Sequence, residues 1–509
     1  MSSISSLQFG SRIFCLVGWF LIGSMVIINS DAELLAQGDL RSPSEIDGSR
    51  LPAGQKPKSS GIASPSSNQK AKAADALFRE LDNLIPGDFE KGSEEEQSMR
   101  AIVEAFQQGK PTDVVKMVEE AAKRPGYPPS DIMLAALSFS NNDQKTGLIL
   151  LERAAINHPE NPAVYSAFAR LAVNGGRLTD ARVLFEKLQS VIVKAGLSQD
   201  GEKFYTAQFL DGMIDISLAQ KKFDEARGHL ERQRELLPDH PKVLMVSAEL
   251  EFKQNDLEKC VEYLATMKRK YPQSRAPEAI VASWFQRTGD PEASEKWIRD
   301  AAGKYPKDPQ VQLEFASWAL NKEDFSTASA AVKKAEDVLM ETTFSKNLKA
   351  KIAFAREAYS VAEAHYESLV STQPMDSDLS NMYALTLVES NDQDKFNRAL
   401  GIARRNLQAM PNNRVALASL GYIQMRGGDL ESARASFAKA SQLSGASPEI
   451  DFFISSYLFK SGEIAKAKQF MDRAMSKEGL FLYRSAAVKL QKQINASELP
   501  TPKKGPEKK

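Results

Sequence analysis

Two distant stretches of the chain share one design. Gly175–Leu188 reads GGRLTDARVLFEKL, and Gly427–Ala440 reads GGDLESARASFAKA. Each begins with a glycine pair that marks a turn, followed by an alanine and, four residues later, a phenylalanine. Lys221–Gln233 and Lys460–Ala474 have the same shape. The spacing of four places the alanine and the aromatic ring on one helical face, so each stretch is predicted to be a turn and a helix.

Counting outward from these stretches gives a period of 34 residues. The intervals are regular except for 11 extra residues at 196–206 and three near Asn391–Asp394. Repeats are predicted to begin near residues 128, 162, 207, 241, 275, 309, 343, 377, 414 and 448. A period of this length is typical of stacked helical repeats.

Two positions of the period carry small side chains. Position 8 is small in nine of ten repeats, and position 20 is small in all ten. The residues at position 8 are Ala135, Ala169, Ile214, Ala248, Ala282, Ala316, Ala350, Ala384, Gly421 and Ser455. Those at position 20 are Gly147, Ala181, Ala226, Cys260, Ser294, Ala328, Ala362, Ala399, Ala433 and Ala467. Only a small side chain fits where two packed helices approach most closely, so the pattern predicts antiparallel helix pairs.

This pattern resembles the tetratricopeptide repeat (TPR) family in its period, its paired small residues and a proline near the end of six repeats. The resemblance covers about 128–481. The aromatic residue usual at position 4 is weak here, since Tyr165 fits and Asp131 does not. The resemblance implies an all-α, right-handed α-solenoid superhelix of about ten antiparallel helix pairs with capping helices. The first helices of the pairs would line a concave groove.

The expected organisation has eight parts. We predict a signal peptide or membrane anchor (1–32), a disordered Gly/Pro/Ser-rich linker (33–73), an N-terminal cap and degenerate repeat (74–127), repeats 1–2 (128–195), an insertion (196–206), repeats 3–10 (207–480), a C-terminal capping helix (481–494) and a disordered Lys/Pro tail (495–509). In the degenerate unit at 94–127, Asp113 occupies the small position. The insertion is expected to divide the array into a short and a longer block.

The N-terminal prediction rests on the apolar run Ile13–Ile28, which follows Arg12. Sixteen residues are few for a membrane span and suit a signal-peptide core. Ser30 and Ala32 place small residues before a possible cut at Glu33. We expect a protein exported across the cytoplasmic membrane, periplasmic or secreted; an uncleaved anchor at 13–28 is the alternative.

Composition excludes several classes of function. The chain has 66 basic and 66 acidic residues, so its formal net charge is zero, which argues against binding nucleic acid over the whole chain. The two cysteines are Cys15, in the apolar run, and Cys260, which replaces alanine at position 20 and is expected to be buried.

No pattern of catalytic or metal-binding residues stands out. None of the four histidines has a His or Cys partner at metal-ligand spacing, and the motifs of nucleotide-binding loops, zinc proteases and serine hydrolases are missing. Asp376-Ser-Asp378 begins like a calcium loop, but Asn381 and Leu387 replace the required glycine and glutamate. The sequence predicts no enzyme, no cofactor and no metal.

The resemblance implies that positions 2, 5, 9, 12 and 13 of each repeat face the groove. Positions 5, 9 and 12 carry six aromatic residues: Phe139, Phe252, Phe354, Tyr422, Phe452 and Phe459. Exposed aromatic rings in a groove would anchor a partner peptide or helix. The alternative is that they pack against the adjacent repeat or the capping helix. Charged residues at these positions are mixed in sign: Arg170, Asp211, Asp215, Glu249 and Lys351. The basic set with which some TPR domains bind a C-terminal carboxylate is missing, since Ile132 and Ala136 stand in its place.

Two functions from different classes remain. The first is a non-catalytic scaffold in the cell envelope or outside the cytoplasm that binds a protein partner along its concave groove. The second is an accessory factor for envelope polysaccharide assembly or export, which binds glycan or a glycan-processing enzyme. Contact with a membrane is expected only through the N-terminal segment, if that segment is not cleaved.

Overall fold

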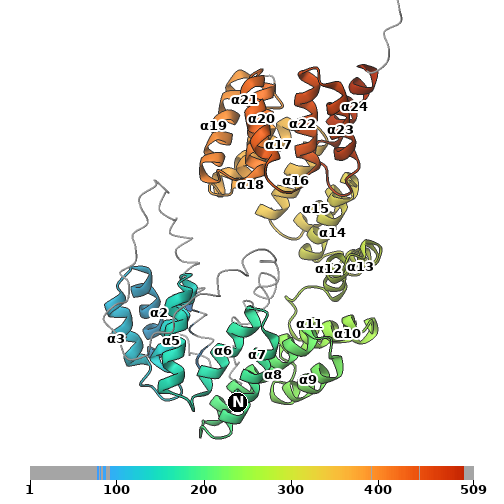
Figure 1. Ribbon diagram of the computed structural model, residues 1–509. Coiled ribbons are helices and arrows are strands. Elements are labelled where there is room, and N and C mark those ends of the chain that lie inside the picture. The colour runs from blue at the N-terminus through green and yellow to red at the C-terminus, as the bar shows by residue number, and fades with distance from the viewer. Residues whose placement is uncertain are drawn as a thin grey trace, which may run out of the picture. The chain divides into compact units, whose positions relative to one another are not determined.

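The computed structural model describes residues 77–78, 81, 84–86, 92–390, 392–445 and 447–497. Every regular element among these residues is a helix, which confirms the all-α class (Figure 1). The predicted signal or anchor (1–32), the linker (33–73) and the tail beyond residue 497 lie outside the described residues. No helix in the described ranges is long and apolar enough to cross a membrane.

The chain divides into two compact units, residues 1–271 and 272–509. The pairs of unit 1 are α2 (Glu94–Gln107) with α3 (Pro111–Ala121), α4 (Ser130–Ser140) with α5 (Gln144–Asn157), α6 (Pro162–Asn174) with α7 (Leu178–Ile192), α8 (Gln199–Ala219) with α9 (Phe223–Leu236), and α10 (Pro241–Lys253) with α11 (Leu257–Lys270).

Unit 2 continues the same alternation and adds one final helix. Its pairs are α12 (Pro277–Thr288) with α13 (Pro291–Lys304), α14 (Pro309–Asn321) with α15 (Phe325–Glu336), α16 (Thr343–Ala355) with α17 (Tyr359–Thr372), α18 (Ser377–Leu387) with α19 (Gln393–Ala409), α20 (Arg414–Arg426) with α21 (Leu430–Ser441), and α22 (Pro448–Lys460) with α23 (Ile464–Met475). Helix α24 (Arg484–Ser497) follows. The array is an α-solenoid, as predicted.

The expected division at the insertion is wrong. The boundary between the units lies after Tyr271, between α11 and α12. Most of the insertion, from Gln199 onward, is helical and lengthens α8 to 21 residues. The extra residues therefore extend a helix that still packs on α9 and on its neighbours α6 and α7, so they do not interrupt the stack.

Local sequence explains where the helices start. Proline occupies the first position of five first helices: α6, α10, α12, α14 and α22. Its fixed φ suits that position, where no backbone N–H is needed. Several second helices begin after an aspartate whose carboxylate accepts the N–H three residues later, which satisfies a free donor of the first turn. These residues are Asp143, Asp256, Asp290, Asp324 and Asp429.

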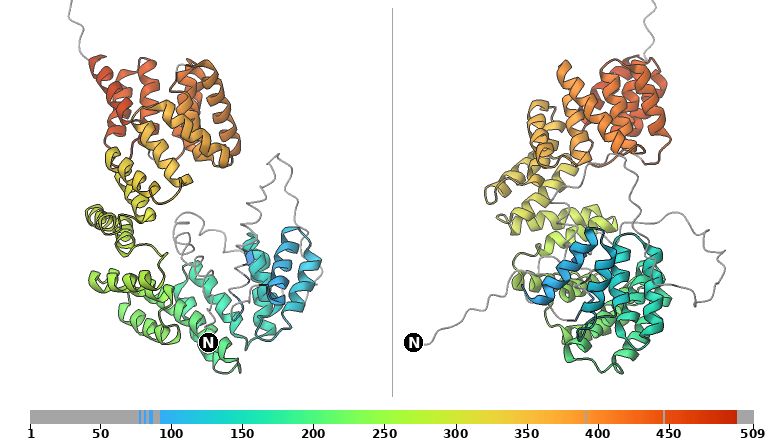
Figure 2. Two further views of the ribbon diagram at one scale, coloured as in Figure 1. Left: turned by 180° about the vertical axis from the view of Figure 1, so that it is seen from behind. Right: turned by 90° about the vertical axis from the view of Figure 1, so that its left-hand side faces the viewer.

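The small residues lie where the pattern predicts. All ten residues at position 20 are buried, and so are all ten at position 8. Each first helix packs against the second helix of its own pair, and several first helices also contact the next one along the chain, as α14 does with α16 and α20 with α22. Within each unit the pairs stack in chain order (Figure 2).

The first pair departs from the frame by one residue. Asp113, placed by the period at the small position, is exposed. Its neighbour Val114 and then Val118 point into the core instead. Helix α2 is 14 residues long, one or more longer than the first helices of most other pairs, and this length shifts α3. Five upstream residues are buried in the same hydrophobic core cluster as Val114 and Val118: Leu77, Phe78, Leu81, Leu84 and Ile85.

Candidate partner-binding cleft

Three of the six predicted groove aromatics are not available to a partner. Phe354, Tyr422 and Phe452 are at most 4% exposed. They gather around the ring of Tyr483, whose centroid lies 5.0 Å from that of Phe354, 5.5 Å from Tyr422 and 5.2 Å from Phe452. For these three residues the groove prediction is wrong, and they pack in the core instead.

What covers them is the chain's own C-terminal strap, which we define as Gly479–Arg484. Phe481 and Tyr483 of the strap are fully buried in the same cluster as the three aromatics. The backbone N–H of Phe481 donates to Glu323 Oε1 at 2.9 Å, and Arg484 Nε lies 2.5 Å from Glu323 Oε2. Glu323 sits in the turn between α14 and α15. The strap thus joins the last repeat to one that lies 158 residues earlier.

The other three aromatics are half-buried. The ring of Phe139 covers Gly147 so closely that a Cβ there would lie 2.5 Å from it, so Phe139 packs within its own pair. Phe459 packs against the cluster around Tyr483, and Phe252 is half-buried at the end of α10. The predicted aromatic groove is therefore mostly core.

Unit 2 does contain an open cleft, on helices that carry none of the six predicted groove aromatics. It has a volume of about 1050 Å³. Its walls come from α12, α13, α14, the start of α16 and residues 477–484 at the strap. The lining includes Arg275, Ala279, Ser283, Gln286, Glu314, Ser317, Trp318, Asn321, Lys322, Phe344, Lys477 and Arg484.

The two main walls repeat one pattern. On α12 the lining residues are Ala279, Ala282, Ser283 and Gln286; on α14 they are Glu314, Ser317, Trp318 and Asn321. Each set has the spacing i, i+3, i+4, i+7, which is one face of a helix. Several of these residues stand at positions 5, 9, 12 and 13 of their repeats, the positions expected to face the groove. The residues at these positions in α12 and α14 are amides and small side chains, whereas the sequence prediction selected aromatic residues and therefore did not include them.

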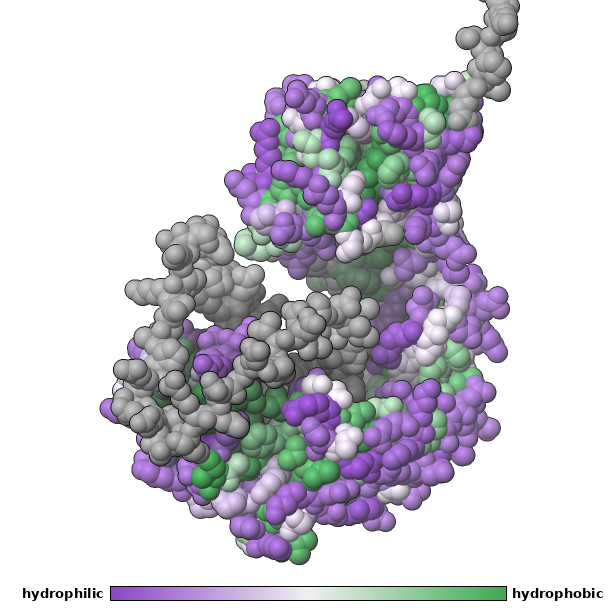
Figure 3. Space-filling model, viewed as in Figure 1, coloured by the Kyte–Doolittle hydropathy of each residue, from purple (hydrophilic) through white to green (hydrophobic). Residues whose placement is uncertain are grey.

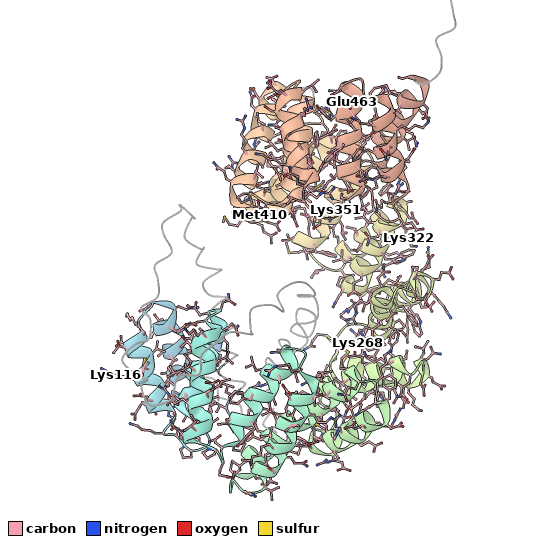
Figure 4. The ribbon with its side chains drawn as sticks, viewed as in Figure 1. Lys116, Lys268, Lys322, Lys351, Met410 and Glu463 are labelled. Atoms are coloured by element: carbon pink, nitrogen blue, oxygen red, sulfur yellow. The ribbon has the colours of Figure 1, made fainter. Side chains whose placement is uncertain are left out.

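The cleft is polar and its strongest charges are already paired. Arg275 donates to both carboxylate oxygens of Glu314, at 3.0 and 2.8 Å, and Arg484 pairs with Glu323. The side chains of Gln286 and Asn321 are exposed, with no hydrogen-bond partner in the described part of the chain. Lys322, labelled in Figure 4, follows α14 at the rim. Paired charges and free amides favour recognition by hydrogen bonds over recognition of a strong charge.

The charged groove candidates of unit 1 are largely engaged. Asp211 accepts from Gln233 and from Lys242, which lies 2.5 Å from Oδ2. Asp215 is mostly buried, and burial raises its pKa to about 6; Lys242 lowers that pKa, while Asp211 and Glu249 add to the rise. An ionised carboxylate in this desolvated position destabilises the folded state at neutral pH.

Neither a reactive thiol nor a metal centre is present among the described residues. Cys260 is buried as predicted, and burial raises the pKa of its thiol to about 12, so it stays protonated and unreactive. No group of three or more His, Cys, Asp or Glu side chains in the described ranges could hold a metal ion.

The comparison with known families agrees with the geometry of the pairs. Residues 217–283 match the tetratricopeptide repeat family. This stretch, from the end of α8 to α12, is therefore similar to tetratricopeptide repeats. TPR proteins are generally non-catalytic scaffolds for protein–protein interaction. No curated protein sequence matches the chain.

Several solved structures match the chain. A TPR protein of Thermus thermophilus is 14% identical, covers 37% of this chain and 100% of its own, with a TM-score of 0.31. A TPR protein of Parabacteroides merdae is 12% identical, covers 57% of this chain and 99% of its own, with a TM-score of 0.30. Yeast Tom70 is 14% identical, covers 84% of this chain and 96% of its own, with a TM-score of 0.29.

Proposed function

We propose that this protein is a non-catalytic scaffold that binds a partner protein in the cleft between α12 and α14. The observation that carries the proposal is the cleft itself, which is lined at groove positions by two consecutive first helices and leaves the amides of Gln286 and Asn321 without partners in the described chain. A primary amide offers a donor and an acceptor together, which suits the backbone of an extended peptide.

The rest of the concave side of unit 2 does not support binding in the same way. On α16, α20 and α22 the aromatic residues at groove positions pack against Tyr483 of the C-terminal strap, so they are not available to a ligand. We infer that a partner of unit 2 binds beside the strap, at α12 and α14, and does not run along the full length of the repeats.

We further propose that the scaffold works outside the cytoplasm. Support comes from the apolar run Ile13–Ile28 and the small residues Ser30 and Ala32, which suit export and cleavage. Fractionation of cells that express the full chain, with a protease-protection assay, tests this directly. Protein found in the cytoplasm with an intact N-terminus would contradict it.

A cross-linked pull-down from envelope extract tests binding at the cleft, with residues 33–509 as bait. The cleft variant, Gln286→Ala/Asn321→Ala, should recover about tenfold less of the specific partner, because it lacks two central contacts. The matched control is Asn412→Ala/Gln442→Ala, which removes one exposed amide of each kind outside the cleft. Equal recovery by both variants would contradict the proposal.

A further inference from the structure

The turn between the two helices of a pair has the same backbone conformation throughout the array. Position 15 has a positive φ in each of the nine repeats in which the structure describes it: Asn142, Gly176, Lys221, Asn255, Gly289, Glu323, Glu357, Gly428 and Gly462. Glycine and asparagine adopt this left-handed conformation readily. Lys221, Glu323 and Glu357 are the exceptions, and a long side chain is strained there. Such strain persists where other contacts offset it.

Both glutamates contact the C-terminal end of the chain. Glu323 accepts the N–H of Phe481 at 2.9 Å and pairs with Arg484. Glu357 pairs with Lys489 of α24, which lies 132 residues later in the chain. The strained turns of unit 2 therefore coincide with the ion pairs that tie the C-terminal end to much earlier repeats.

The C-terminal end joins the last helix pair through a short exposed link. We define the latch as Gly479–Ser497, which is the strap followed by α24. Ser476, Lys477 and Glu478 before it are exposed, and so is Gly479, whose φ is 93°. Helix α24 packs on α23 and α22, which already form a complete pair (Figure 1). The latch can thus move about its link without unwinding a repeat.

The latch covers aromatic rings of the repeats. Phe354, Tyr422 and Phe452 pack against its Tyr483, and its Phe481 is buried in the same cluster. The face of unit 2 drawn in Figure 3 is mostly hydrophilic, so loss of the latch would add an apolar patch to the molecule. The hydroxyl of Tyr483 is buried with no hydrogen-bond partner in the described chain, which disfavours the covered state relative to an open one.

We propose that Gly479–Ser497 is a detachable latch, a conformational switch built into unit 2. In the closed form, Glu323 and Glu357 dock the latch, and its rings fill the aromatic face of α16, α20 and α22. In the open form, the latch leaves as one piece, the helix pairs stay folded because each stacks on its neighbours, and the aromatic face is exposed. Opening requires no occupant of the cleft, so its test is independent of the proposed function.

Cutting the folded chain at the link tests the proposal. A protease recognition site is inserted between Lys477 and Glu478 of the full chain, both of which are exposed, and a fluorescent synthetic peptide of residues 478–509 is added after cleavage. The peptide should replace the cut fragment while the helical circular dichroism of the repeats is unchanged. The uncut chain should take up little peptide, because its tethered latch competes at a high effective concentration.

Glycine substitutions separate the docking contacts from the backbone of the turn. In the cut chain, Glu323→Gly/Glu357→Gly should bind the peptide at least about tenfold more weakly, because it lacks the ion pairs with the latch. Glycine suits the left-handed turn, so weaker binding cannot come from a damaged turn. Lys221→Gly, at the same turn position in unit 1, is the matched control and should bind as wild type does.

Three results would overturn the proposal. Loss of the helical signal on cleavage would show that the latch is an integral part of the repeat core. A cut fragment that never exchanges with the peptide would show that the latch does not detach. A double glutamate variant that binds the peptide as tightly as Lys221→Gly would show that the two glutamates do not dock it.

Discussion

Single glycines show how tightly the helices of this array approach one another. Gly212 of α8 faces the fully buried ring of Phe185, and a Cβ built on it would lie 2.0 Å from the ring. Gly228 of α9 is exposed, with nothing within 4 Å of its Cβ position. A side chain larger than hydrogen is therefore excluded at Gly212 but has room at Gly228, in the next helix.

We expect Gly212→Ala to lower the free energy of unfolding by about 1–3 kcal/mol, the usual cost of overpacking a filled core. Gly228→Ala should raise it by about 0.5–1 kcal/mol, because alanine favours the helix at an open site. Urea unfolding followed by circular dichroism measures both changes. Equal effects for the two substitutions would contradict the packing seen between α7 and α8.

The buried carboxyl of Asp215 makes a pH-dependent contribution to stability. Its folded pKa is raised to about 6 by desolvation, from an ordinary value of 3.8. Between these values the folded state holds a proton that the unfolded state releases, so stability from this group is present at low pH and falls as pH rises through 6.

Asp215→Asn should remove this pH-dependent contribution to the free energy of unfolding. Relative to wild type, we expect the variant to gain roughly 2 kcal/mol in free energy of unfolding on going from pH 4 to pH 8. Denaturant unfolding at the two pH values measures the difference, with Asp472→Asn, at an exposed site, as control. A variant whose stability relative to wild type is the same at both pH values would show that Asp215 is not desolvated.

At the scale of elements, the C-terminal strap replaces the simple cap that was expected. Residues 481–494 were predicted to form one capping helix, but α24 begins only at Arg484 and ends at Ser497. The residues before it form the strap, which reaches Glu323 and the aromatic cluster. The strap therefore links repeats that would otherwise contact only their neighbours.

Two substitutions at Tyr483 separate the roles of its ring and its hydroxyl. Tyr483→Ala should cost about 3–5 kcal/mol, because it removes a ring from the centre of a core. The hydroxyl is buried with no hydrogen-bond partner in the described chain, so Tyr483→Phe should be neutral or stabilising by up to about 1 kcal/mol. Thermal unfolding measures both, and a large loss in the Phe variant would refute this account of the hydroxyl.

At the scale of the molecule, the fold followed from the sequence and the site did not. The small residues at positions 8 and 20 lie at a contact that every helix pair makes. Because this local pattern occurs ten times, the sequence predicts the solenoid. The contacts of Tyr483 with Phe354 and Tyr422 occur once and join distant repeats, so no period reports them. A phenylalanine at a groove position reads the same in sequence whether the groove is open or filled by the chain itself.

The division into two units predicts local effects of mutation. Phe481→Ala should lower hydrogen-exchange protection in the helices of unit 2 that the strap contacts, α14 to α22, because it loosens their shared core. Protection of α4 to α9 in unit 1 should stay within experimental error. Exchange followed by mass spectrometry on the intact chain measures both regions together. Equal loss in the two units would mean that they unfold as one.

The central claim is that a partner protein binds in the cleft between α12 and α14. The most direct test is in-cell photo-cross-linking of the full chain, with a benzophenone amino acid placed at Asn321 in the cleft or at Asn412, an exposed residue outside it. The account predicts a discrete covalent adduct from position 321 that position 412 does not give and that Gln286→Ala weakens. No adduct from 321, or the same adduct from both positions, would contradict it.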